Sequence, residues 1–246
     1  MQRFGTLSQM NIAAPTCRPG EIGALLRGET GLIAQWMERW EAGRLALHIG
    51  MIMLGAGLYG AAMGWWRAPE QALYTAIKLP MIILLTTLGN ALLNAMLAPL
   101  LGLNLTFRQS LLAILMSSAM AAAILGSFSP IAAFVVWNAP TLVPDEQMAS
   151  GAYGFVKLLQ VAVIAFAGVM ANVKLWRMLA QMGGDPAAAT RVLLAWLAGN
   201  LLLGGELSWI LRPFIGSPLL PVEFLRDDAL QSNFFEAVWK AMQQVF

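Results

Sequence analysis

The chain has 246 residues, of which 59% are hydrophobic and 11% charged. Soluble proteins usually contain about 45–50% apolar and about 25% charged residues, so the composition excludes an ordinary soluble domain. A formal net charge of +2, with basic residues scattered singly, gives no support for nucleic-acid binding. Cys17 is the single cysteine, which excludes an internal disulfide and a multi-cysteine metal site.

The first 44 residues are expected to form a leader followed by an amphipathic helix. Residues 1–20 contain glycines and prolines without a sustained period. In residues 21–42 apolar side chains recur at helical spacing, and the charged residues fall largely on the other side. Such a helix lies in the membrane interface with its tryptophans at headgroup depth, or packs on its own bundle. No signal-peptide pattern precedes the first span, which we expect to remain in the mature protein.

Five apolar stretches follow, and each is long enough to cross about 30 Å of hydrocarbon. We predict a polytopic all-α bundle that occupies residues 45–211. Pro80, Pro99 and Pro130 predict kinks or frayed ends in the two longest stretches. A split second span would give six crossings, but Lys78 and Pro80 leave one full-length stretch before Gly102. The predicted spans are 45–66, 72–103, 110–137, 155–175 and 190–211.

The distribution of Lys and Arg predicts the orientation of the bundle. Nine of these residues precede the first span or lie on the same side, against six on the other side. The loop from Asn138 to Ser150 has two acidic residues and no basic one, which suits an outer position. We therefore expect the N-terminus inside and residues 212–246 outside. That tail predicts a short helix with an apolar side formed by Phe234, Phe235, Val238, Trp239, Met242 and Phe246.

Small residues at helical spacing indicate where spans approach closely. Gly60 and Gly64 form a GxxxG step in the first span, and Ala195 and Gly199 form a similar step in the fifth.

Glu206 is the one carboxylate inside a predicted span, roughly 21 Å past Val192 at 1.5 Å per residue. A charged group at that depth usually has a partner. Lys78 and Lys157 are predicted near the outer ends of their helices, and Arg212 follows Glu206 closely. One hypothesis makes Glu206 an ion or proton site that a lysine tunes, with Asn200 on the same helix. The favoured hypothesis is an ion pair that fixes helix packing, because no line of further titratable groups makes a proton path.

Other polar residues favour packing over catalysis. Asn90 and Asn94 share a helix face and are expected to bond across helices. His48, the only histidine, is expected at the membrane interface. With one His and one Cys the chain lacks the usual zinc ligands, and neither GxGxxG nor GxxxxGK[ST] occurs. The sequence therefore predicts no catalytic residues, no metal and no cofactor.

Two stretches carry a family resemblance. GLYGAAMG followed by ALYTAIKLPMIILL resembles the start of the core in bacterial Yip1-like membrane proteins, with their glycine-tyrosine step and KxP motif. SWILRPFIGSPLLPVEFLR and SNFFEAV are similar to the C-terminal end of a group of bacterial multi-spanning proteins. The resemblance implies a five-helix bundle in the inner membrane of a bacterium, with a cytoplasmic N-terminus. Its motifs include Tyr59, Lys78, Pro80, Arg212, Pro213, Phe214 and Pro218.

The sequence leaves three functions open. The leading one is a non-enzymatic integral membrane protein that acts as a scaffold or as a subunit of a membrane assembly, in contact with the bilayer and with a second copy or another membrane protein. The first alternative is a small channel or transporter that uses Glu206. The second is a membrane-remodelling or lipid-interacting protein that depends on residues 1–42.

Overall fold

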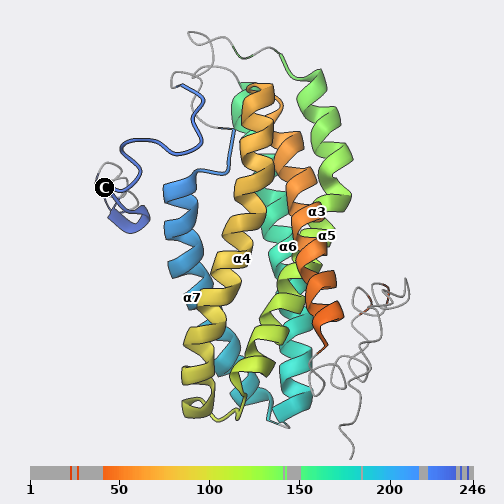
Figure 1. Cartoon of the computed structure of the whole chain (residues 1–246), viewed down its shortest axis with the longest axis vertical. Helices are drawn as coiled ribbons and strands as arrows, with labels where there is room; N and C mark the ends of the chain where they lie inside the picture. Colours follow the sequence, from red (N-terminus) through yellow and green to blue (C-terminus); the bar gives the residue numbers. More distant parts are fainter. Residues whose placement is uncertain are drawn as a thin grey trace, which may run out of the picture.

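The computed structural model describes residues 23, 27, 41–140, 142, 151–183, 185–215, 221–236, 239 and 243. Within these residues the chain is helical and contains no strand. Five long helices run along one axis in alternating directions (Figure 1). All five are long and apolar enough to span a membrane, which is the architecture of an integral membrane protein. They are α3 (Ala42–Gly64), α4 (Pro69–Leu100), α5 (Phe107–Asn138), α6 (Gly151–Gly183) and α7 (Pro186–Leu211).

The prediction of five spans is confirmed, but the helices do not all begin and end at the predicted bounds of the spans. The second span is one uninterrupted helix, with Pro80 and Pro99 inside α4. The fourth, predicted as 155–175, continues to Gly183. Lys174 and Arg177 end the apolar stretch but do not end the helix, because backbone hydrogen bonds continue through polar residues. Hydropathy therefore identifies the membrane-spanning part of each helix better than its ends.

Local sequence explains where several helices begin. Pro69 and Pro186 occupy the first positions of α4 and α7, where the missing proline N–H costs nothing. At the start of α5, the Thr106 hydroxyl accepts a hydrogen bond from the backbone N–H of Gln109, whose side chain reaches back to the Thr106 N–H. The Asp185 carboxylate accepts from two backbone N–H groups in the first turn of α7.

The predicted terminal helices are only partly described. The amphipathic helix expected over 21–42 lies outside the described residues except for Gly23, Arg27, Glu41 and Ala42. In the C-terminal tail, residues 234–236, 239 and 243 are helical, in agreement with the predicted short helix. Val238, Met242 and Phe246, which were expected on its apolar side, lie outside the described residues.

Helix α3 packs against its neighbours through glycines. A Cβ atom at Gly60 would lie 2.5 Å from the carbonyl oxygen of Thr75, and one at Gly64 would lie 2.2 Å from the Thr75 hydroxyl. The predicted GxxxG step therefore faces α4. On another side of α3, a Cβ atom at Gly55 would lie 2.1 Å from the backbone oxygen of Ala122 in α5. These distances bring the three backbones close together.

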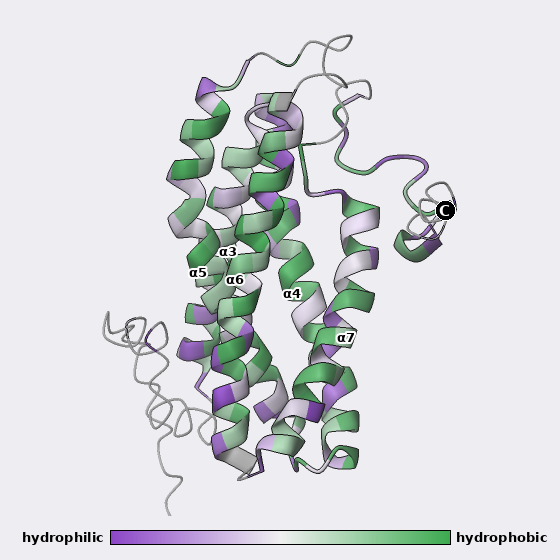
Figure 2. Ribbon diagram, turned by 180° about the vertical axis from the view of Figure 1, so that it is seen from behind, coloured by the Kyte–Doolittle hydropathy of each residue, from purple (hydrophilic) through white to green (hydrophobic). Residues whose placement is uncertain are grey.

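Apolar residues cover the middle of the bundle, while hydrophilic residues gather mainly near its ends and along residues 221–236 (Figure 2). Many large apolar side chains on the long helices are exposed, including Leu58, Met96, Phe134 and Leu158. Such a surface suits the hydrocarbon of a bilayer, where lipid replaces water around the helices. The bundle thus presents polar groups where it meets water and headgroups.

Candidate functional site

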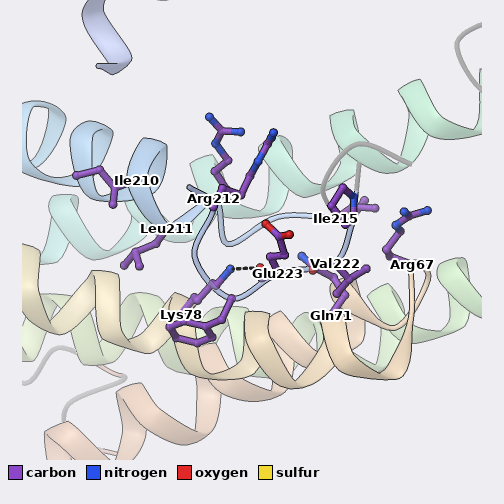
Figure 3. Close-up of a pocket in the computed structure, with 12 residues that line it drawn as sticks. Arg67, Gln71, Lys78, Ile210, Leu211, Arg212, Ile215, Val222 and Glu223 are labelled. Atoms are coloured by element: carbon purple, nitrogen blue, oxygen red, sulfur yellow. Dashed lines mark hydrogen bonds between the residues drawn. The ribbon is translucent and has the colours of Figure 1, made fainter. Parts of the chain in front are cut away.

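The candidate site lies at the end of the bundle where α7 stops. Arg212 follows the helix with φ 46°, in the left-handed region, and Pro213 cannot continue the helix. The chain then returns toward α4 as the C-terminal segment, which we define as residues 221–236. A pocket of about 160 Å³ lies between this segment and the helices (Figure 3). Arg67, Gln71, Lys78, Arg212, Glu223 and Arg226 contribute its polar lining.

Lys78 lies in this pocket and binds the C-terminal segment. Its side chain is 2% exposed, and Nζ donates a hydrogen bond to the backbone oxygen of Glu223 at 3.3 Å (Figure 3). The ammonium also lies 5.7 Å from the ring centroid of Tyr74 and 5.0 Å from that of Phe224. Aromatic faces attract a cation through their quadrupole. Lys78 is therefore held by a carbonyl and two rings.

Gln71 provides a second attachment from the same side of α4, two turns before Lys78. Its Nε2 donates to the backbone oxygen of Phe214 at 2.6 Å, and the residue is buried. A residue seven positions away in a helix lies on the same face, so the two donors point to one stretch of returning chain. Sequence reasoning did not select Gln71, although its spacing from Lys78 was a usable signal.

Helix α7 holds the other end of the C-terminal segment. The Glu206 carboxylate accepts a hydrogen bond from the backbone N–H of Phe234 at 3.3 Å. One turn on, the indole Nε1 of Trp209 donates to the backbone oxygen of Ser232 at 3.0 Å. Both contacts are made to main-chain atoms. They fix the path of the backbone, while Phe224 of the segment packs inward on Tyr74 and Lys78 and Leu230 is exposed.

The ion pair predicted for Glu206 is not formed within the described part of the chain, and this corrects the favoured hypothesis. Lys78 binds the Glu223 carbonyl, and Lys157 lies 4.4 Å above the ring of Tyr153. Arg212 lies 3.9 Å from Asp228 and stacks 5.2 Å from the Trp209 ring. The physical reason is that the C-terminal segment supplies partners to all three of Glu206, Lys78 and Arg212. No periodic pattern in the sequence predicts the register of that segment.

Asn200 belongs to a different cluster, deeper in the bundle. Nδ2 of Asn90 donates to the Asn200 side-chain oxygen at 2.9 Å and to the backbone oxygen of Trp196 at 3.0 Å. Nδ2 of Asn94 donates to the Asn90 backbone oxygen at 2.8 Å. Asn90 and Asn94 are 0% and 1% exposed. The expectation of a bond across helices is confirmed for Asn90, whereas Asn94 bonds Asn90 on its own helix. Asn200 does not join Glu206 in one polar site.

The donor set of the pocket under the C-terminal segment suits backbone binding. Its volume of about 160 Å³ is below the range of about 300–1,000 Å³ that is usual for ligand pockets. Within the described residues no three His, Cys, Asp or Glu side chains gather as metal ligands. His48 is 2% exposed, and its Nδ1 donates to the Arg44 carbonyl oxygen at 2.6 Å. The donors at this site therefore position the backbone of the chain that follows α7.

Comparison with models of known families, with characterised proteins and with solved structures finds no significant match for this chain. The resemblance to Yip1-like proteins stays a prediction.

Proposed function

We propose that the protein is a non-enzymatic integral membrane protein that serves as a scaffold or subunit of a membrane assembly, with the C-terminal segment as its contact surface. The observation that carries this proposal is the use of Gln71, Lys78, Glu206 and Trp209. These side chains, from two helices, all bind main-chain atoms of the returning chain. Gln71 and Lys78 are buried, and Glu206 and Trp209 are half-buried, so these contacts act mainly on where the returning chain lies.

The outward face of the segment supports a role in binding another protein. Leu225 is 52% exposed and Leu230 is 79% exposed, although both lie beside fixed backbone. Asp227 and Glu223 lie in the same stretch, so the surface combines apolar and acidic side chains. A preformed surface binds a partner with less loss of conformational entropy than a free tail. In the predicted orientation this surface is extracytoplasmic.

Crosslinking in the membrane tests the proposal. A photoreactive amino acid replaces Leu230 in the full chain, and the mass of each adduct identifies what it touches. We expect a discrete protein adduct, either a second copy or another subunit. The matched control carries the same group at Phe134, which is 69% exposed on the bundle, where lipid adducts are expected. Lipid adducts alone at both positions would contradict the proposal.

A second pair of variants shows whether the adduct depends on the surface. Leu225→Ser should lower the yield of the protein adduct from position 230, because it removes apolar area beside the crosslinker while leaving the backbone contacts intact. Leu158→Ser changes a residue that is 71% exposed on α6, outside the segment, and should leave the yield unchanged. Equal losses in both variants would point to a general effect on expression or folding.

The contact of Glu206 also separates this proposal from a small transporter. A carboxylate that accepts from the Phe234 N–H has a structural task, and a glutamine at that position keeps an acceptor oxygen. We therefore expect Glu206→Gln to leave the protein folded and any ion flux in liposomes unchanged. Proton or ion flux in the wild type that disappears in a folded Glu206→Gln variant would favour the transporter.

A further inference from the structure

A larger pocket opens between α6 and α7 near the same end of the bundle. It has a volume of about 580 Å³, within the range of about 300–1,000 Å³ for ligand sites. It shares Arg212 and Ile215 with the pocket under the C-terminal segment but is lined mainly by other residues. Because its walls come from two membrane-spanning helices, a membrane component has direct access to it.

The polar lining of this α6–α7 pocket consists of hydrogen-bond donors without a carboxylate. Lys157 and Gln160 lie one turn apart on α6, and Ser208 lies one turn before Arg212 on α7. Gln160 is 6% exposed, and its amide makes no hydrogen bond within the described part of the chain. Lys157 forms no ion pair there and lies against the Tyr153 ring. Arg212 keeps further N–H groups besides the one that faces Asp228 at 3.9 Å.

The pocket continues toward the centre of the bundle. Ile164, Ser208 and Phe214 also line a second pocket of about 340 Å³, which lies among α4, α5, α6 and α7. Its lining is predominantly apolar, with side chains such as Ile83, Ile114 and Leu175. A cationic opening near the helix ends thus leads to an apolar interior. This order of groups matches an amphiphile with an anionic head and a hydrocarbon chain.

We propose that the α6–α7 pocket binds one anionic phospholipid. Its phosphate accepts hydrogen bonds from Lys157, Gln160 and Arg212, and an acyl chain lies along Ile164 and Phe214 toward the inner pocket. The bilayer is the source of the ligand, because most of the pocket is apolar and a soluble phosphate would leave that part unfilled. Basic pockets between membrane-spanning helices recognise lipid headgroups on the cytoplasmic side of membranes, and the α6–α7 pocket uses the same chemistry at the end predicted to lie outside. The site is independent of the scaffold function proposed above.

Native mass spectrometry of the full chain in a maltoside detergent tests the headgroup. Dioleoylphosphatidylglycerol and dioleoylphosphatidylcholine are the probes, one anionic and one neutral overall. We expect one phosphatidylglycerol to bind more tightly, and Lys157→Gln to weaken it roughly fivefold, as the loss of one cation near a lipid headgroup implies. Gln160→Leu should also weaken it. The matched control is Lys174→Gln, the same change in α6 at a residue outside the lining, which should leave binding unchanged.

A second matched pair tests the acyl chain. Gly168 lines the inner pocket, and a Cβ atom there has nothing within 4 Å, so Gly168→Leu fills the path of the chain without an initial clash. Gly154 on the same helix has equally open surroundings but lies outside both linings, and Gly154→Leu is the control. We expect phosphatidylglycerol binding to be lost in Gly168→Leu alone, at an unchanged thermal midpoint of the lipid-free protein.

Several results would overturn the proposal. Equal binding of the two lipids, or equal effects of Lys157→Gln and Lys174→Gln, would remove the headgroup site. Displacement of the lipid by excess inorganic phosphate would mean that the pocket is an ion site. If Gly168→Leu does not fold, the Lys157 and Gln160 variants still decide the question. Neither of these two substitutions breaks an ion pair within the described residues.

Discussion

The two sides of the bundle are held together by different means. On the α3 side, glycines let backbones approach until a single added Cβ would overlap a carbonyl oxygen, as at Gly55 beside Ala122. On the α7 side, the contacts depend on side chains, such as the amide of Asn90 and the indole of Trp209. Two of the larger pockets also lie on the α7 side, bounded by α6 and α7.

This difference shows which part of the protein can adapt. Close backbone packing has few alternatives, because nothing flexible lies at the contact. A contact made by one amide or one indole can be released at the cost of one or two hydrogen bonds. We therefore interpret α3, α4 and α5 as the fixed part of the bundle, and α7 with the C-terminal segment as the part that meets a ligand or a partner.

The largest expected effect is that of Gly55→Leu. The new side chain has to displace the backbone of α5, since the ideal Cβ lies 2.1 Å from the Ala122 oxygen. We expect a loss of about 3 kcal/mol in the free energy of unfolding, at the upper end for overpacked cores. Gly50→Leu is the matched control on the same helix, because a Cβ atom at Gly50 has nothing within 4 Å. Unfolding in mixed micelles, followed by circular dichroism, measures the free energy of unfolding of both variants. Similar losses in the two would remove the contrast between the α3 side and the α7 side of the bundle.

An intermediate effect is expected from Asn90→Ala. The substitution removes the bonds to Asn200 and to the Trp196 carbonyl, which join α4 to α7. Polar bonds between membrane helices contribute about 0.6 kcal/mol on average, so the loss of two predicts about 1 to 1.5 kcal/mol. The control is Asn172→Ala, whose side chain, among the residues that the structure describes, bonds only its own helix, at the Gly168 oxygen 2.8 Å away. The same unfolding assay applies. An equal loss of unfolding free energy in the control would show that the bonds between α4 and α7 add no more stability than a bond within one helix.

The smallest expected effect is that of Trp209→Phe. A phenyl ring can still lie beside Arg212, but the hydrogen bond to the Ser232 carbonyl is lost. We expect a local destabilisation of about 0.5 to 1 kcal/mol, seen as faster amide hydrogen exchange in residues 221–236 and little change in global unfolding. Trp176→Phe is the control, since its indole donates to the Thr190 hydroxyl at 3.0 Å, at the opposite ends of α6 and α7. Faster exchange of the segment in both variants would contradict a local attachment.

The sequence predicted the five helices because each must be apolar over the thickness of a bilayer, which leaves a strong signal. It also predicted the close approach at Gly60 and Gly64, since small residues one turn apart suit a helix contact. The partner of Glu206 was predicted incorrectly. The group that binds it, the N–H of Phe234, lies 28 positions further on, in a stretch with no period that fixes its register. Main-chain partners of this kind leave no residue type to recognise.

The number of membrane-spanning helices has a consequence for how the protein is made. Five crossings would put Glu41, before α3, and residues 221–236, after α7, on opposite sides of the membrane. In the predicted orientation, insertion of α7 has to be accompanied by translocation of the acidic residues Glu223, Asp227 and Asp228. The bonds from Gln71, Lys78, Glu206 and Trp209 can form only after that step. We therefore expect the polar end of the bundle to be completed late in biogenesis, after α3, α4 and α5 have been inserted.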